Sequence, residues 1–112
     1  MKNILIILLF LTIGNFAIAQ LVVKHGALHV DGTQLKDKAG NDVVLRGMSF
    51  GWHNFWPRFY TAGTVNWLSK DWGCTVVRAA MGVEPANGYI EKPAWSKEKI
   101  KTVVDAAIKE GI

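Results

Sequence analysis

Short apolar runs separated by turn-forming pairs occupy much of the chain between residues 27 and 81 and predict strands. At 27–46, an Asp-Gly pair and a Gly-Asn pair interrupt β-prone runs, which is typical of a small antiparallel unit. Residues 45–50 read as a further strand. The continuous apolar run at 74–81 is bounded by glycines, and it suits a strand buried on both faces, as in a parallel sheet.

A helical period of 3.6 residues marks the segment from Thr64 to Trp72. Val65, Leu68 and Trp72 fall on one face of a helix with this period. Thr64 is expected to cap the start, and Gly73 supplies the stop. These signals predict one helix between the two longer strands.

A second helical segment fills the end of the chain. Ser96 is expected to cap it, with Glu98 in the first turn, where the helix dipole favours an acid. Gly111 stands at the expected C-cap. The predicted buried stripe contains five apolar residues: Ile100, Val103, Val104, Ala107 and Ile108.

The order after the opening unit is strand, loop, helix, strand, loop, helix, which predicts an α/β fold with a parallel sheet covered by helices. Two such units cannot close a sheet into a barrel. The second helix would turn its apolar stripe towards only two parallel strands. We therefore expect the chain to be part of a larger domain, with a third strand due after Gly111.

The first 19 residues have the pattern of a secretory signal peptide. Lys2 precedes an apolar run from Ile4 to Ile13, and the small-x-small motif at 17–19 marks a cleavage site before Gln20. The alternative is a membrane anchor, but a spanning helix needs about 20 apolar residues. Residues 20–112 are therefore expected to form the mature chain, secreted or periplasmic and not bound to a membrane.

Charge and cysteine content exclude several classes of function. Loss of Lys2 leaves 12 of the 13 Lys and Arg residues against nine Asp and Glu, a net charge of +3, and the charges are scattered. Nucleic acid binding therefore has little support. The single cysteine, Cys74, sits in an apolar run and is expected to be a buried thiol, so the fold does not depend on disulfides. We expect no cofactor.

Arg78 is the most informative single residue. It interrupts an apolar strand, and a buried guanidinium is costly unless it is paired. It also lies towards the carboxyl end of that strand, where parallel α/β folds place their active sites. We expect it to hold a carboxylate, although an arginine that reaches solvent or makes a structural pair remains the alternative.

The loop after the first long strand is rich in aromatic residues, with six rings in residues 50–60. Flat apolar rings suit the C–H faces of sugars, and His53 and Asn54 add polar groups. We expect the rings to divide between two roles. The candidates for ligand binding are Trp52, Phe55 and Trp56, and those for packing are Phe50, Phe59 and Tyr60.

The other polar candidates are weaker. His53 lacks a second histidine or cysteine at metal-ligand spacing, so no metal site is expected. Glu84 and Glu91 are the carboxylates of the second loop, and glycosidase chemistry needs two. Both are expected to be solvated surface residues.

Several stretches together resemble the start of glycoside hydrolase family 5 cellulases, the endo-β-1,4-glucanases. They are LRGMSFGWHNFWPRFY, VNWLSKDWGCTVVRAAMG, GYIEKP and VVDAAIKEGI, and the resemblance runs from about Val23 to Ile112. It implies a (β/α)8 TIM barrel, of which this chain supplies the N-terminal part: a β-hairpin and about two βα units.

The resemblance also implies secretion and retaining hydrolysis of β-1,4-glucan by two glutamates on later strands, beyond this chain. Arg78 matches the family arginine that supports the carboxylate of the nucleophile. Phe55 and Trp56 match the aromatic pair that lines the glycone subsites. A family histidine falls at Gly51 and a family tyrosine at Gly82, so Trp52 and His53 are expected to compensate.

Two kinds of alternative remain open from the sequence. A mannanase or a xyloglucanase would use the same barrel. A non-catalytic carbohydrate-binding module would use exposed aromatics without an acid pair, although such modules are usually antiparallel sandwiches. We expect the substrate to be a β-glucan polysaccharide, the full-length protein to be a monomer, and residues 1–112 alone to be inactive.

Overall fold

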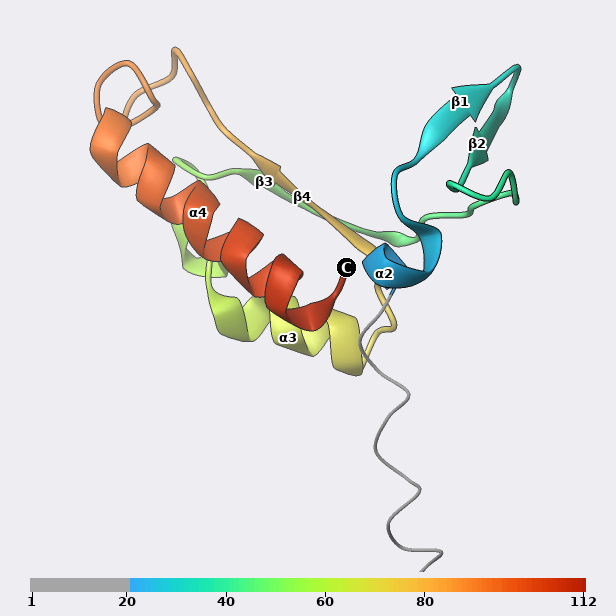
Figure 1. Cartoon of the computed structure of the whole chain (residues 1–112). Helices are drawn as coiled ribbons and strands as arrows, with labels where there is room; N and C mark the ends of the chain where they lie inside the picture. The colour runs from blue at the N-terminus through green and yellow to red at the C-terminus, as the bar shows by residue number, and fades with distance from the viewer. Residues whose placement is uncertain (1–20) are drawn as a thin grey trace, which may run out of the picture.

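A computed structural model describes residues 21–112 (Figure 1). The predicted signal peptide, residues 1–19, lies outside the described residues. Within the described part of the chain, no helix has the length and apolar character needed to cross a membrane. In chain order the elements are α2 (Leu21–His25), β1 (His29–Asp31), β2 (Gln34–Lys36), β3 (Gly47–Trp52), the 3-10 helix η1 (Pro57–Phe59), α3 (Ala62–Lys70), β4 (Val76–Ala80) and α4 (Pro93–Glu110).

The predicted antiparallel unit is confirmed as the β1–β2 hairpin. Val30 pairs with Leu35, and Gly32 supplies the positive φ of 58° that its turn needs. Asp37 ties the hairpin to α2, because its carboxylate contacts His25 Nδ1 at 3.1 Å and accepts backbone N–H bonds from Ala39 and Asn41. The hairpin and α2 stand beside the larger βα unit (Figure 1).

The two longer strands, β3 and β4, pair in parallel, as the sequence predicts. Ser49 lies opposite Arg78, and Trp52 lies opposite Ala80. Between these two pairs β3 therefore contains one residue more than β4. Gly51 takes up this bulge with a φ of 70°. The carboxyl ends of both strands therefore open into loops at the same end of the sheet.

Both longer helices lie on one face of the β3–β4 sheet (Figure 1). The core between these layers contains Phe50, Tyr60, Val65, Leu68, Cys74, Val103 and Ala106. Burial of Cys74 agrees with the prediction. The expectation that β4 is buried on both faces is wrong for the described residues, because Arg78 is exposed on the face away from the helices.

Helix α3 begins earlier than predicted. Thr61, not Thr64, is the N-cap, because Thr61 has an extended backbone and its side chain accepts the Thr64 N–H at 3.1 Å. Val65 and Leu68 are buried as expected. Trp72 lies beyond the end of the helix and is 58% exposed, so its predicted place on the buried face is wrong.

Helix α4 also begins three residues before the predicted cap. Pro93 occupies the first helical position, where its fixed φ and missing N–H are tolerated. Ser96 is therefore inside the first turn and fully buried. In the stripe, Val103 is buried, but Val104 and Ile108 are exposed, against the prediction. Gly111 is confirmed as the C-cap, with a left-handed φ of 76°.

Candidate functional site

The candidate residues gather at the carboxyl ends of β3 and β4. The aromatic loop leaves β3 after Trp52, and the loop over residues 81–92 leaves β4. The two loops touch, because the Asn54 amide donates to the Ala86 carbonyl at 3.1 Å. Parallel α/β folds build their sites from loops in this position.

Arg78 occupies the sheet face away from the helices. Its Nη1 donates to the Ser49 hydroxyl at 3.0 Å, across the pair that the strand register places opposite. Phe50, the next residue on β3, points to the other face and joins the core. A guanidinium carries five N–H donors, so a bond to one hydroxyl leaves most of them free to hold a carboxylate.

The rings of the aromatic loop form two groups. Trp52 and Phe55 stack with their ring centroids 5.8 Å apart, and both are about half exposed. In the second group, the Arg58 guanidinium lies 5.8 Å from the Trp56 ring centroid and 4.8 Å from that of Phe59. The first group presents rings to solvent close to the end of β3.

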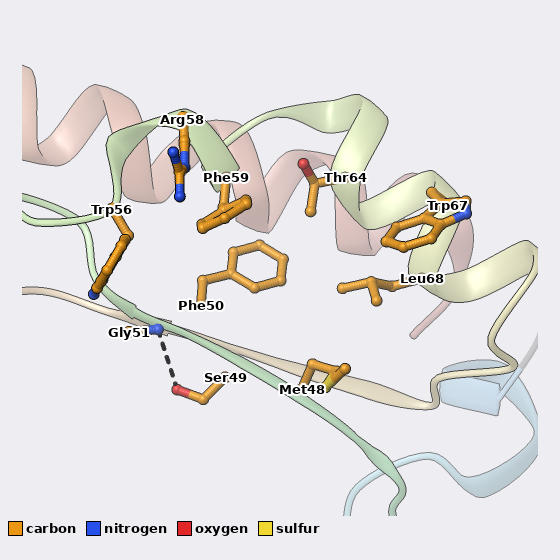
Figure 2. A pocket seen from close by; sticks show the side chains of 10 residues that line it. All are labelled: Met48, Ser49, Phe50, Gly51, Trp56, Arg58, Phe59, Thr64, Trp67 and Leu68. Carbon is orange, nitrogen blue, oxygen red and sulfur yellow. Dashed lines mark hydrogen bonds between the residues drawn. The ribbon is translucent and has the colours of Figure 1, made fainter.

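Gly51 fixes the position of Trp56. A Cβ on residue 51 would lie 2.7 Å from Trp56 Cδ1, so the indole packs directly against a backbone that only glycine allows this close. Figure 2 shows Trp56 beside Gly51 and the bond between the Gly51 N–H and the Ser49 hydroxyl. Residue 51, which matches a histidine in the family, must therefore be a glycine in this chain.

Of the three rings expected to pack in the core, two are buried and one is exposed. Phe50 and Tyr60 are buried and pack edge to face at 5.6 Å, as predicted. The Tyr60 hydroxyl lies within hydrogen-bonding distance of the Gly51 and Ala80 carbonyl oxygens, and burial raises its pKa. Phe59 is 40% exposed, so its predicted burial is wrong.

His53 lies beneath the aromatic loop and is fully buried. The Gly82 N–H donates to its Nδ1 at 3.2 Å, so in the neutral ring the proton is on Nε2, which donates to Ser96 Oγ at 2.8 Å. Burial lowers the pKa of His53. The histidine joins the aromatic loop, the β4–α4 loop and α4, and it offers no exposed edge.

The bond between His53 and Ser96 was missed by the sequence reasoning. The two residues are 43 positions apart, and the sequence around Ser96 predicts only a helix cap. Trp95 completes the pocket of the imidazole at a centroid distance of 5.1 Å. No short-range pattern indicates these contacts, since they arise from packing of α4 against the end of β3.

The two glutamates of the second loop are both exposed, as predicted, but they differ in their bonding. Glu91 accepts the Asn87 N–H at 2.8 Å and so stabilises the turn in which Asn87 has a positive φ of 61°. Among residues 21–112, Glu84 has no hydrogen-bond or ion-pair partner. The same residues contain no group of three His, Cys, Asp or Glu side chains that could hold a metal ion.

Two open hollows flank these loops. One, of about 510 Å³, lies between β3, the aromatic loop and α3 (Figure 2); Met48, Phe50, Trp56, Phe59, Trp67 and Leu68 supply its apolar lining. The other, of about 500 Å³, lies at the carboxyl ends of the strands and is lined by Trp52, Met81, Val83, Glu84 and Pro85. The second adjoins the exposed Trp52–Phe55 pair.

The sequence from residue 36 to residue 112 matches the family model described as cellulase (glycosyl hydrolase family 5). The chain belongs to glycosyl hydrolase family 5. Endoglucanase Z of Dickeya dadantii is similar, with 46% identity over 77 residues, 69% of this chain and 17% of that protein. Endoglucanase A of Butyrivibrio fibrisolvens is 36% identical over 84 residues, 75% of this chain and 20% of that protein.

Solved structures show the same fold. A protein from Cytophaga hutchinsonii superposes with a TM-score of 0.79 and 47% identity, over 83% of this chain and 30% of that one. The catalytic domain of Thermobifida fusca endoglucanase Cel5A gives a TM-score of 0.73 and 31% identity, over 81% and 30%. The predicted fold class is therefore confirmed: the described elements form part of a (β/α)8 barrel, and the chain spans less than a third of these relatives.

Proposed function

We propose that the protein is a secreted endo-β-1,4-glucanase, which cleaves cellulose chains internally with retention of configuration. Membership of a cellulase family supports the reaction class. The observation that carries the proposal to this chain is the exposed Trp52–Phe55 stack, which lies where β3 ends, at the carboxyl end of the strand pair that carries Arg78. Flat rings suit the C–H faces of a polysaccharide, and a guanidinium suits a catalytic carboxylate.

In this proposal the chain binds the sugar and orients the nucleophile, and it does not itself carry the two catalytic glutamates. One glutamic acid protonates the glycosidic oxygen, and a glutamate about 5 Å away attacks the anomeric carbon; water then hydrolyses the glycosyl-enzyme. Arg78 would donate hydrogen bonds to the attacking carboxylate, which keeps it ionised and fixed in direction.

The aromatic loop would hold the glycone side of the glucan, the part of the polysaccharide whose anomeric carbon is attacked. Trp52, Phe55 and Trp56 are the proposed contacts, because all three are exposed. His53 would not contact the sugar. It would hold the aromatic loop in place through its hydrogen bonds with Gly82 and Ser96. The segment before Gln20 would direct the protein out of the cytoplasm.

The test is an assay of the protein expressed from its complete reading frame, including any codons after 112. Carboxymethylcellulose, glucomannan and xyloglucan are offered as separate substrates, and the anomer first released from cellopentaose is recorded by proton NMR. We expect preferred cleavage of the β-1,4-glucan with retention. Preference for mannan or xyloglucan would make the protein another enzyme of this barrel, and glucan binding without hydrolysis would indicate a carbohydrate-binding module.

A further inference from the structure

A β-turn at the end of β3 carries the exposed ring pair. The Phe55 N–H donates to the Trp52 carbonyl at 3.1 Å, so Trp52 and Phe55 are the outer residues of this turn. His53 and Asn54 are its central residues. Because the stacked rings belong to the two outer residues, the orientation of the turn sets where both rings lie.

The two central residues attach the turn to different parts of the β4–α4 loop. His53 accepts the Gly82 N–H at its Nδ1, at the start of that loop. Asn54 reaches four residues further, because its Nδ2 donates to the Ala86 carbonyl at 3.1 Å. The Tyr89 N–H donates to the Gly82 carbonyl at 2.8 Å, so the loop also has a bond of its own. Asn54 is thus the second attachment, which limits rotation of the turn about the first.

Gly82 leaves the space that the Asn54 amide occupies. A Cβ on residue 82 would lie 2.3 Å from Asn54 Oδ1 and 3.0 Å from Asn54 Cγ, and the three atoms nearest to it all belong to this side chain. The φ of Gly82 lies outside the left-handed region, so other residues could adopt its backbone. Lack of space beside Asn54 is therefore what excludes a side chain at residue 82.

The Asn54 side chain holds this place at a cost to stability. Its Oδ1 is buried and has no hydrogen-bond partner within residues 21–112. A buried acceptor without a partner destabilises a fold. The Nδ2 bond offsets little of this, because Ala86 is exposed and water can bond its carbonyl instead. A polar group that is kept although it destabilises the fold indicates a functional role.

We infer that Asn54 is a positioning residue, which holds the Trp52–Phe55 turn against the β4–α4 loop in the orientation that binds glucan, and that Gly82 makes room for it. The inference rests on the proposed function for its ligand. Asn54 acts through the turn and does not itself contact the sugar, since its Oδ1 is buried. It orients loops and leaves the strand that carries Arg78 unchanged, so its effect belongs to substrate binding and not to bond cleavage.

The first test measures kcat, KM and urea unfolding for Asn54→Ala in the protein expressed from its complete reading frame, with cellopentaose as substrate. We expect KM to rise about twofold to tenfold, the value of one hydrogen bond between neutral groups, and kcat to stay the same. The free energy of unfolding should change little, because the substitution removes the unpaired acceptor together with the bond to Ala86.

Asn66→Ala is the matched control. The Asn66 Nδ2 also joins two elements, because it donates from α3 to the buried Glu110 carboxylate on α4 at 2.9 Å. We expect this variant to show the opposite pattern, with a lower free energy of unfolding and an unchanged KM. The two asparagines together separate a positioning role from a purely structural one.

The second test approaches the same contact from the other loop. The methyl group added by Gly82→Ala displaces the Asn54 amide, so KM should rise as much as in Asn54→Ala. The double variant should match either single variant, because the shortened side chain at residue 54 leaves room for the methyl group. If the two effects on KM multiply in the double variant, the residues act independently and the inference is overturned.

Two further outcomes decide the inference. An Asn54→Ala protein with lower stability and an unchanged KM would overturn it, while the proposed function would still stand on the activity of the wild type. Should the wild type hydrolyse no glucan, the proposed function fails, and amide hydrogen exchange then tests the attachment. Faster exchange of residues 52–56 and 82–90 in both single variants supports the positioning role, and unchanged exchange refutes it.

Discussion

The position of Arg78 in β4 predicts a carboxylate partner, whereas its side-chain partner in the structure is the Ser49 hydroxyl. The sequence indicated a functional arginine because an apolar strand rarely carries a guanidinium, and the structure places it in register with Ser49, with donors to spare. The sequence left open whether Arg78 reaches solvent, because its exposure depends on which elements cover the sheet.

A substitution that keeps the charge tests the proposed role of Arg78. Lysine lacks the planar fork that binds a carboxylate through two hydrogen bonds. We expect Arg78→Lys to lower kcat/KM on carboxymethylcellulose by about tenfold to a hundredfold, the value of one hydrogen bond to a charged group. Ser49→Ala, which removes the neighbouring hydroxyl, should lower it by less than about tenfold. Equal activity in Arg78→Lys would exclude the proposed role.

His53 predicts a dependence of stability on pH. The folded protein disfavours the imidazolium, because burial lowers the pKa and the Gly82 N–H needs an unprotonated Nδ1. As the pH falls through the ordinary value of 6.5, the unfolded chain takes up a proton before the folded one does. The free energy of unfolding should therefore decrease below this pH.

The matched variant for this prediction is His53→Gln, which can still accept from Gly82 and donate to Ser96 but does not titrate. Urea unfolding of the complete protein at pH 8 and at pH 5.5 measures the effect. We expect the wild type to lose more stability between these pH values than the variant does. Equal losses would show that His53 is not the group responsible.

At the scale of elements, the sequence predicted kinds and order better than ends and faces. From the sequence, Thr61 and Thr64 are equally good N-cap residues. Thr61 is the cap in the structure because it adopts an extended backbone after η1. Likewise, Ser96 looked like a cap because Pro93 could equally have belonged to the loop. Ile108 is apolar yet 72% exposed, since a pattern of apolar residues does not say what lies beside it.

The pairing of β3 with β4 depends on a glycine. A Cβ on residue 47 would lie 1.7 Å from the Val76 carbonyl oxygen, a backbone atom that can move only if the strands separate. We expect Gly47→Ala to lower the free energy of unfolding by about 4 kcal/mol or more, or to prevent folding. Soluble yield and urea unfolding of the complete protein measure this.

Gly63 in α3 is the control for that substitution. The nearest atom to a Cβ there is 3.9 Å away, and the residue is helical. Gly63→Ala should therefore stabilise the protein by about 0.5 kcal/mol, because alanine loses less backbone entropy on folding. A Gly47→Ala protein as stable as the Gly63→Ala one would contradict the strand register.

At the scale of the molecule, several large apolar side chains have no cover within the described residues. Met48 and Trp67 line the hollow beside β3, and both are more than two fifths exposed. The sheet face that carries Arg78 is open as well. Exposed apolar surface of this kind marks a face that other segments or molecules normally cover.

The chain of residues 20–112 on its own should therefore fold poorly. We expect it to bind the dye ANS, which reports exposed apolar surface, and to unfold in urea without a sharp transition. The product of the complete reading frame should bind little dye and unfold cooperatively. A sharp transition in residues 20–112, without dye binding, would mean that these elements form a stable domain unaided.

The most direct test of the central claim is a comparison of hydrolysis by these two proteins. The release of reducing ends from carboxymethylcellulose is measured for purified residues 20–112 and for the product of the complete reading frame, at equal concentration. The account predicts hydrolysis by the complete protein and none by residues 20–112, because in the proposed mechanism the two catalytic glutamates lie on strands that residues 20–112 do not include. Hydrolysis by residues 20–112 at the rate of the complete protein would contradict it.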